Sequence, residues 1–490
     1  MSSVVRSSTI RILLALTALL ATSSLASADN DNEAPSFLRD IAPTLMRHCS
    51  GCHGEKKNEG GYRLHTFAGL MGTPADPAVH PGDPDNSLFY QVLIDTDDAD
   101  RMPQKDEPLD REMIEKIRQW ILAGARYDGT DPAERIKVVL PPREHPVSPQ
   151  VYRVPTPVFA LAISPDGSEL AVGGYHEITR WGCETLTLKG RLQRLPERIQ
   201  DLQFLKSGKR LLAGGGSPGD YGELVAIDLG TGARKVIGTF EDVVLALAVD
   251  SKEKMVAAST ADRCVRVYDL TSGERLWESR SHADWVTGLA FSNEDRYVVS
   301  SSRDMTVKVH DAKTGELFTT YTGHTRQYKA YTGRFRVYDV VFDSKTRSLL
   351  SAGEGRAIRL WDAEKARAEN GTAGDMEKRF SVEGHTRYLD HHFKHTAFKL
   401  SARDGHVFSA SGDGIVKRHD IASQELVRRY EGGSDWLFAL DVHLPSRKVA
   451  AGAFNGEVRI WDTETGETTG VFNAAPGRSS HRNPTDAPSD

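Results

Sequence analysis

The sequence predicts a small all-α domain followed by a larger all-β domain. Between residues 34 and 128, apolar residues recur at helical spacing. From residue 151 to residue 476 the apolar runs are short and of β type, and they recur at a regular interval. Residues 129–150 separate the two patterns and hold five prolines, so we expect a stiff, extended linker there.

The first 28 residues are typical of an export signal. Arg6 and Arg11 precede an apolar run that ends in Ala-Ser-Ala at 26–28, a suitable cleavage site. An uncleaved membrane anchor is the alternative, but the strongly apolar part stops near Ala21, which is short for a span of about 20 residues. We therefore expect an exported, periplasmic or equivalent protein without a membrane span after cleavage. The net charge of −6 gives no basic excess for nucleic acid.

Two amphipathic helices are expected within residues 34–128. Asp110 is a suitable N-cap for the second helix, and Gly124 is a suitable stop. Each helix carries one apolar stripe: Phe37, Ile41, Leu45 and Cys49 in the first, and Ile114, Ile117, Trp120 and Ile121 in the second.

Residues 49–53 form the motif Cys-x-x-Cys-His. Two thiols three positions apart lie on one side of a helical turn and can form thioether bonds to the two vinyl groups of one haem, with the histidine as proximal iron ligand. Four cysteines and 17 histidines placed at random would give about 0.001 such motifs. Zinc would need a second ligand pair at suitable spacing, and a thioredoxin-like redox pair would need a βαβ context. The sequence offers neither.

The segments around this motif are similar to the planctomycete-type cytochrome c domain, a family of exported c-type cytochromes. The resemblance covers nearly all of residues 36–127, including FLRDIAPTLMRHCSGCHG and HPGDPDNSLFYQVL. It implies one covalent haem c per chain, attached to Cys49 and Cys52, with His53 as proximal and Met102 as distal iron ligand. The family's usual Met-Pro-Pro is Met-Pro-Gln here, at residues 102–104.

The residues themselves also favour Met102 as the sixth iron ligand. It lies in a loop before the last helix, where Pro103 prevents helix formation. An open site is an alternative, as are other side chains that we expect in helix cores or on the surface: Met46, Met113, His65 and His80. His/Met ligation raises the haem potential and leaves no position for substrate, which favours electron transfer over catalysis.

The β-type runs of residues 151–476 end near Asp, usually after an aromatic residue. These aspartates are spaced by 41, 42, 51, 58 and 42 residues: Asp228, Asp269, Asp311, Asp362, Asp420 and Asp462. This period, with Gly-His at 323–324 and 384–385, is typical of WD repeats of four strands each. The divergent repeat FALAISPDGSELAVGGYHEITRWG brings the count to seven.

These repeats resemble the WD-repeat β-propeller family, which implies a seven-bladed ring over residues 151–476 and a protein-docking role. The last outer strand could come from VYRVP at the start or ETTGVFN at the end. Residues 477–490 are polar and predict a disordered tail. A cluster of three histidines could bind a metal ion but is better interpreted as a loop: His391, His392 and His395. The basic, tyrosine-rich residues 325–338 could dock an acidic partner but are also better interpreted as a loop. Cys183 and Cys264 are expected as buried thiols.

We therefore predict an exported mono-haem cytochrome that is not itself an enzyme and whose propeller docks a protein redox partner. Two alternatives remain open. The chain could be the haem subunit of a propeller oxidoreductase with a second cofactor in its central channel. It could also be a haem-based redox or gas sensor.

Overall fold

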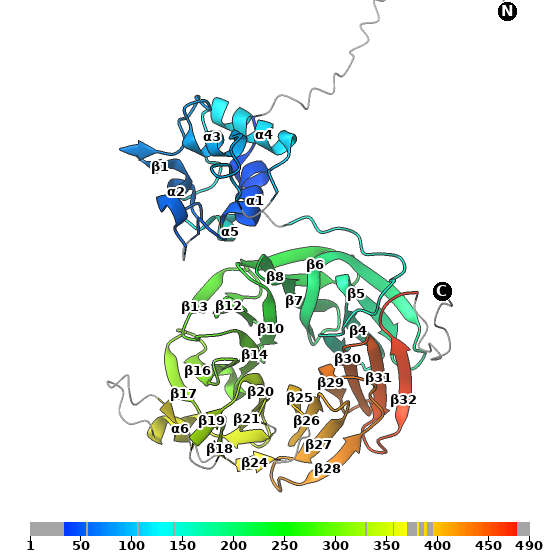
Figure 1. The fold of residues 1–490 in the computed structure, drawn as a ribbon. Helices are drawn as coiled ribbons and strands as arrows, with labels where there is room; N and C mark the ends of the chain where they lie inside the picture. Colours follow the sequence, from blue (N-terminus) through cyan, green and yellow to red (C-terminus); the bar gives the residue numbers. More distant parts are fainter. Residues whose placement is uncertain are drawn as a thin grey trace, which may run out of the picture.

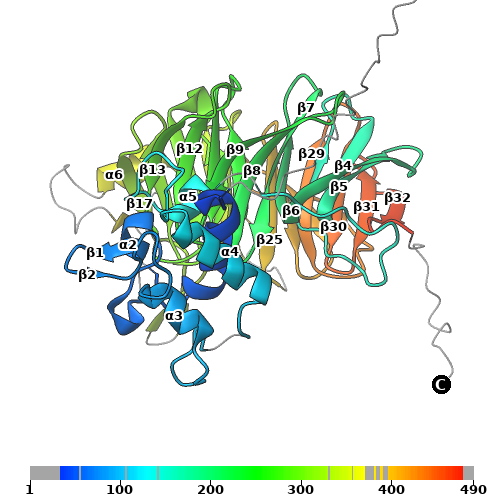
Figure 2. The ribbon, with the colours of Figure 1, turned by 90° about the horizontal axis from the view of Figure 1, so that it is seen from above.

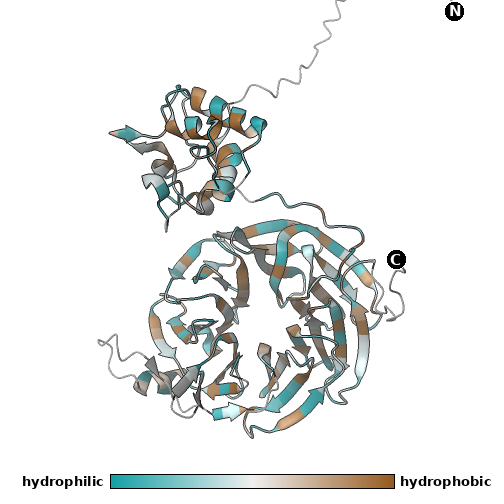
Figure 3. Ribbon diagram, in the orientation of Figure 1, coloured by the Kyte–Doolittle hydropathy of each residue, from teal (hydrophilic) through white to brown (hydrophobic). Residues whose placement is uncertain are grey.

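A small helical domain lies against the outside of a ring of β-sheets in a computed structural model of the chain (Figures 1 and 2). The structure describes residues 34–54, 57–104, 107–140, 143–328, 331–355, 357–369, 380–381, 387–389 and 395–477. The predicted export signal, the predicted tail from residue 478 onward, and His391 and His392 lie outside these residues. Apolar and polar residues alternate along many strands of the ring, as a sheet with two different faces requires (Figure 3).

The helical domain contains eight short helical segments and one two-stranded ribbon. They are η1 (Phe37–Ile41), α1 (Ala42–Thr44), η2 (Leu45–Cys49), η3 (Glu59–Gly61), α2 (Phe67–Met71), β1 (Gly72–Thr73), β2 (Asp76–Pro77), α3 (Leu88–Ile94), α4 (Arg111–Leu122) and α5 (Ile136–Val139). The first predicted helix is thus a succession of three segments over residues 37–49. The second is α4, and its predicted N-cap is confirmed because the Asp110 side chain accepts a hydrogen bond from the Met113 N–H at 2.7 Å.

The two predicted apolar stripes meet in the core of the helical domain. Phe37 and Trp120 are both buried, and their ring centroids lie 5.5 Å apart. Leu45, Ile117 and other apolar side chains of the two stripes belong to the same core. Burial of this surface is the main force that holds such short helices together.

The prediction of an extended linker over residues 129–150 is wrong in one part. Helix α5 forms there, and Ile136 is fully buried in the core of the helical domain. Its N–H donates to the His65 carbonyl at 2.9 Å. The helix forms despite the surrounding prolines because Ile136 is buried in a core that the linker composition does not reveal.

Seven consecutive strands form the first sheet of the ring, and they pair in chain order. They are β3 (Leu161–Ile163), β4 (Glu169–Gly173), β5 (Tyr175–Gly182), β6 (Leu188–Phe204), β7 (Arg210–Ser217), β8 (Tyr221–Asp228) and β9 (Arg234–Phe240). Strand β6 is 17 residues long. Its first part pairs with β5 and its last part with β7, so one strand joins two four-stranded units.

Five further sheets complete the ring, each with four antiparallel strands in chain order. They comprise β10 (Val244–Val249), β11 (Met255–Thr260), β12 (Val265–Asp269) and β13 (Arg275–Ser279); β14 (Val286–Phe291), β15 (Tyr297–Ser302), β16 (Val307–Asp311) and β17 (Leu317–Tyr321); β20 (Val337–Asp343), β21 (Ser348–Gly353), β22 (Ile358–Trp361) and β24 (Arg387–Leu389); β25 (Ala397–Arg403), β26 (His406–Ser411), β27 (Val416–Asp420) and β28 (Leu426–Tyr430); and β29 (Leu437–His443), β30 (Lys448–Ala453), β31 (Glu457–Asp462) and β32 (Thr468–Asn473).

Smaller elements lie in the connections between these strands: the hairpin β18 (Thr325–Tyr328) and β19 (Tyr331–Arg334), the 3-10 turn η4 (Asn293–Asp295), helix α6 (Ala363–Glu369) and β23 (Phe380–Ser381). Strand β23 pairs in parallel with β17.

The inner strands contact one another in a closed succession: β3, β6, β10, β14, β20, β25 and β29, which returns to β3. They line a central channel of about 330 Å³. The last outer strand is β32, so ETTGVFN supplies it, and VYRVP does not.

The repeated aspartates hold the turn after the third strand of each unit. Asp228 accepts hydrogen bonds from the N–H groups of Gly230 and Thr231 at 3.1 and 2.8 Å. Asp462 accepts equivalent bonds from Glu464 and Thr465, both at 2.8 Å, and these bonds lower its pKa to about 2. The sequence signature of the repeat is therefore structural, because it satisfies main-chain donors in a tight turn.

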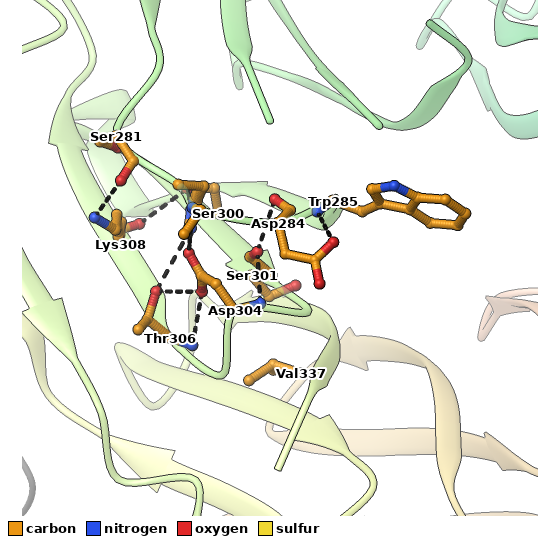
Figure 4. Close-up of polar contacts among 12 residues, drawn as sticks. Ser281, Asp284, Trp285, Ser300, Ser301, Asp304, Thr306, Lys308 and Val337 are labelled. Atoms are coloured by element: carbon orange, nitrogen blue, oxygen red, sulfur yellow. Dashed lines mark hydrogen bonds and ion pairs between the residues drawn. The ribbon is translucent and has the colours of Figure 1, made fainter. Parts of the chain in front are cut away.

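Buried histidines join the strands within two neighbouring sheets. In the sheet that begins at β14, His282 lies 2.8 Å from Asp304 and 2.9 Å from Ser300, and the Thr306 hydroxyl donates to Asp304 (Figure 4). In the next sheet, His324 of the predicted Gly-His pair lies 2.7 Å from the Ser351 hydroxyl. Each imidazole is thereby held by polar groups that would otherwise be unpaired inside the sheet.

We expect acid to destabilise the ring through its buried histidines. Burial lowers the pKa values of His282 and His324, and it lowers that of His310 to about 3. The unfolded chain takes up these protons near pH 6.5 and the folded chain does not, so stability is present above pH 6.5 and is lost as the pH falls toward 3. Each histidine should contribute a slope of up to about 1.4 kcal/mol per pH unit.

The measurement is urea unfolding of the full chain and of His310→Gln at several pH values from 7 to 4. In the variant, the slope of the free energy of unfolding against pH should be smaller by the contribution of about one proton. An unchanged slope in His310→Gln would contradict the assignment.

Candidate functional site

One cavity of the helical domain brings together the four residues predicted to hold a haem. Cys49, Cys52, His53 and Met102 all line this space of about 610 Å³. Most of the remaining wall is apolar, and its main apolar side chains come from α3 and the loop before α2: Leu64, Leu88, Phe89, Val92 and Leu93. Every residue of the wall belongs to the helical domain, so the ring takes no part in forming the cavity.

The cysteine motif continues the turn of the first helical succession. Cys49 is the last residue of η2, and its carbonyl accepts hydrogen bonds from the N–H groups of Cys52 and His53 at 3.2 and 3.0 Å. Burial, with a smaller contribution from Cys52, raises the pKa of the Cys49 thiol to about 11. A thiol that stays neutral is a poor redox nucleophile. This environment therefore disfavours a thioredoxin-like role.

His53 is fixed through its main chain, and the residue lines the cavity. Its carbonyl accepts a hydrogen bond from the Leu64 N–H at 2.6 Å. Its Nδ1 atom is buried without a hydrogen-bond partner among the described residues. An unpaired imidazole nitrogen in an apolar space is costly unless a further group completes the site.

Met102 is held against α3 by a main-chain hydrogen bond. Its N–H donates to the Val92 carbonyl at 2.8 Å. The loop before it is braced because the Asp97 side chain accepts from the Ala99 N–H at 2.9 Å, and the Gln104 amide donates to the Ala99 carbonyl at 2.5 Å. The thioether is thus presented to the cavity from a loop, as predicted.

The other candidates for a sixth ligand do not line this cavity. Met46 is buried in the core, and Met113 accepts a hydrogen bond from the Thr44 hydroxyl at 3.4 Å. His65 lines a separate cleft between the helical domain and the ring. The main-chain N–H of His80 donates to the Ser87 hydroxyl at 2.9 Å. The structure therefore brings Met102 and His53 together and separates these alternatives from them.

Sequence reasoning missed the polar part of the cavity wall. His48, Glu59, Tyr62 and Gln104 line it beside the predicted residues. The position of His48, directly before Cys49, was a usable signal, because the neighbours of a haem-attachment cysteine lie close to the bound group. Tyr62 and Glu59 could not be assigned, since only the folded loop brings them to the cavity.

These residues fit a haem c. The cavity is apolar, two thiols lie at one side, and an imidazole and a thioether provide the donor set of a His/Met-ligated iron. Across the described part of the chain, no group of three or more His, Cys, Asp or Glu side chains could hold a metal ion.

The helical domain contacts the ring through residues that do not line the cavity. Arg135 forms an ion pair with Glu241 at 2.6 Å. A cleft of about 410 Å³ between the two parts is lined by Gly51 and Gly54 on one side and by residues 241–242 and 261–263 on the other.

The remaining predicted candidates lie apart from the cavity. Cys183 and Cys264 are buried in the ring, as predicted, and burial raises their pKa values to about 11 and 12. In the basic stretch 325–338, Arg336 is paired with Glu354 at 3.5 Å. No helix in the described residues is long and apolar enough to cross a membrane.

Comparisons with known proteins agree with this division of the chain. Residues 49–106 match the family model described as Planctomycete cytochrome C. Residues 234–269, 273–311 and 315–362 match the WD domain, G-beta repeat. An 83-residue stretch is 28% identical to THO complex subunit 6 of Arabidopsis thaliana, which is 17% of this chain and 23% of that protein. The chain therefore joins a cytochrome c domain to a WD-repeat domain, and it spans less than a quarter of that relative.

Replacing both motif cysteines should abolish covalent haem. We expect Cys49→Ser/Cys52→Ser, produced with a haem-attachment system, to lose all haem that survives denaturation, because no thioether can form. The pyridine haemochrome spectrum of the denatured protein measures this, with one haem per chain expected in the unaltered protein. Cys183→Ser is the matched control, since it removes a buried thiol of the ring. Full covalent haem in the double variant would refute the assignment.

Proposed function

We propose that this protein is an exported mono-haem c-type cytochrome that carries single electrons and docks a protein partner on a seven-bladed WD propeller. The observation that carries the proposal is the single apolar cavity in which His53 and Met102 meet Cys49 and Cys52. Export rests on the signal-like residues 1–28.

The proposal of seven blades is supported by a division of the first sheet at β6. Its first part closes a four-stranded unit with β3, β4 and β5, and its last part opens another with β7, β8 and β9. With the five remaining sheets this makes seven units, each with one inner strand at the channel. A propeller of this kind leaves few open strand edges and offers broad loop-covered faces for binding.

In this proposal Cys49 and Cys52 would attach the haem, and His53 and Met102 would hold its iron. The haem supplies reversible one-electron chemistry when bound. The protein's own part is to hold both side chains at one apolar cavity and to exclude water with the Leu and Phe side chains of α3. With both side chains bound to the iron, no position on the iron would be left for a substrate.

An oxidoreductase with a second cofactor in the channel receives less support. The channel holds Lys399, whose Nζ lies 3.5 Å from Asp201 and 4.0 Å from Asp339. The remaining space of about 330 Å³, lined in part by this ion-paired side chain, is at the lower end of the size of ligand pockets. A haem-based gas sensor would need a ligand that leaves the iron easily, and the Met102 loop is held by three hydrogen bonds.

Met102→Ala should keep the covalent haem and lower its reduction potential, by on the order of 0.1 V, because axial ligation is a main determinant of the potential. Spectroelectrochemical titration measures the potential, and carbon monoxide binding to the reduced protein reports the opened position. Met113→Leu is the matched control, since Met113 lies outside the cavity and its change should alter neither reading. Unchanged potential in Met102→Ala, or tight carbon monoxide binding by the unaltered protein, would contradict His/Met ligation.

A further inference from the structure

The same Asp-Trp pair occurs twice in the ring, at equivalent places. Asp284-Trp285 directly precedes β14, and Asp435-Trp436 directly precedes β29. In each pair the carboxylate accepts a hydrogen bond from the N–H of the tryptophan, at 2.7 and 2.8 Å. Each tryptophan carbonyl then accepts a main-chain hydrogen bond from the loop after the second strand of the same sheet. The two sites therefore share one backbone frame.

The residue that donates this last bond differs between the sites. It is Arg303 at the first site, at 3.0 Å from the Trp285 carbonyl, and Phe454 at the second, at 2.9 Å from the Trp436 carbonyl. The two residues occupy the same position in their sheets.

At the first site the guanidinium of Arg303 occupies the space beside the Asp-Trp pair. The Arg303 Cζ atom lies 4.3 Å from the centre of the Trp285 ring, and its Nε lies 3.9 Å from the Asp284 carboxylate. Figure 4 shows Asp284 and Trp285 together, with the indole extending away from the buried network. A planar cation stacked on an indole beside a carboxylate combines a cation–π contact with an ion pair.

At the second site no cation of the described residues takes this place. Phe454 cannot supply one, and Asp435 makes no ion pair within the described ranges. Trp436 is 52% exposed and Phe454 is 50% exposed, against 40% for Trp285. Phe398 and Phe438 extend the aromatic wall, with ring centroids 6.1 and 6.3 Å from that of Trp436. The result is an exposed aromatic patch with one carboxylate at its edge.

We infer that Asp435 and Trp436 bind an arginine side chain of a partner protein. The first site shows within this chain which group fits the pair, and the second site presents the same pair without it. Arginine fits better than lysine because the guanidinium is planar and can stack on the indole while it donates to the carboxylate. Aromatic residues and arginine are also the side chains that contribute most at protein interfaces. This inference rests on the proposed docking role and specifies the chemistry of the partner.

The patch lies on the face of the ring that holds the haem domain. Residues 241–242 precede β10, and residues 261–263 follow β11, so they occupy the same connections in their sheet as Trp436 and Phe454 do in theirs. These two loops line the cleft to the helical domain. A partner bound through Asp435 and Trp436 would therefore lie on the side of the ring where electrons can reach it.

The test uses the full chain labelled with [15N]tryptophan, whose seven indole N–H signals are recorded by NMR. The signal missing in Trp436→Phe identifies Trp436. The probe is the peptide acetyl-Leu-Arg-Leu-amide, and its matched control carries citrulline, which has the same shape without the charge. We expect the Trp436 signal to shift on titration with the arginine peptide and not with the citrulline peptide. Asp435→Asn should weaken binding at least about fivefold, since it removes the ion pair.

Exchanging the two distinguishing residues gives reciprocal expectations. Phe454→Arg should fill the second site from within and abolish the Trp436 response, whereas Arg303→Phe should open the first site and create a Trp285 response. Thermal unfolding by circular dichroism checks that both variants fold. Equal shifts with citrulline, a Trp436 response that survives in Phe454→Arg, or no response at all would overturn the inference. Covalent haem is measured in the same samples, so a failure here is separate from a failure of the cytochrome proposal.

Discussion

Closure of the ring between its last and first inner strands is the constraint on which the rest of the structure depends. The Asp441 carboxylate on β29 accepts a hydrogen bond from the Ile163 N–H on β3 at 2.8 Å, across 278 residues of sequence. Asp201 and Asp339 make the same kind of link to the next inner strand, with Leu247 and Leu400. A carboxylate that satisfies a buried main-chain donor fixes both the position and the register of the neighbouring strand.

Closure also anchors the segment that leads to the haem domain. The Tyr152 N–H donates to the Pro476 carbonyl at 3.2 Å, and the Tyr152 hydroxyl donates to Glu177 at 2.6 Å. Further toward the haem domain, His145 lies 2.8 Å from Glu223, and Arg143 pairs with Asp220 at 3.0 Å. With Ile136 in the helical core, the connection is attached at both ends. The haem domain is thus held on the ring while its cavity is built from its own residues alone.

The sequence was most informative where a function requires fixed spacing. Cys49, Cys52 and His53 are separated by the pitch of one helical turn, and the repeated aspartates are separated by one four-stranded unit, so both patterns are visible in the linear chain. Met102 could be singled out because Pro103 places it in a loop. Spacing alone could not show that Cys49 would be buried or that Val92 would hold the Met102 loop.

Features that depend on tertiary contacts could not be predicted in this way. Helix α5 forms because Ile136 packs into the core of the helical domain. No local signal in the sequence outweighs the nearby prolines. The double use of β6 requires a strand to bend from one unit into the next, which the alternation of apolar residues does not encode. The relation between Arg303 and Phe454 appears only when hydrogen bonds place them at equivalent positions, because 151 residues of other repeats separate them in sequence.

The central channel of the ring is bridged by an ion-paired lysine. Burial lowers the pKa of Lys399, yet the carboxylates of Asp201 and Asp339 outweigh it and the net shift is upward, so the lysine stays charged. Burial raises the pKa of Asp339 and the nearby ammonium partly offsets this effect, so that the pKa is about 6. A charged lysine that links strands across the channel stabilises the ring through its centre and occupies the place where another propeller could hold a cofactor. Under the proposed function the redox group lies outside the ring, in the helical domain, and the loops of the ring's faces are available for recognition.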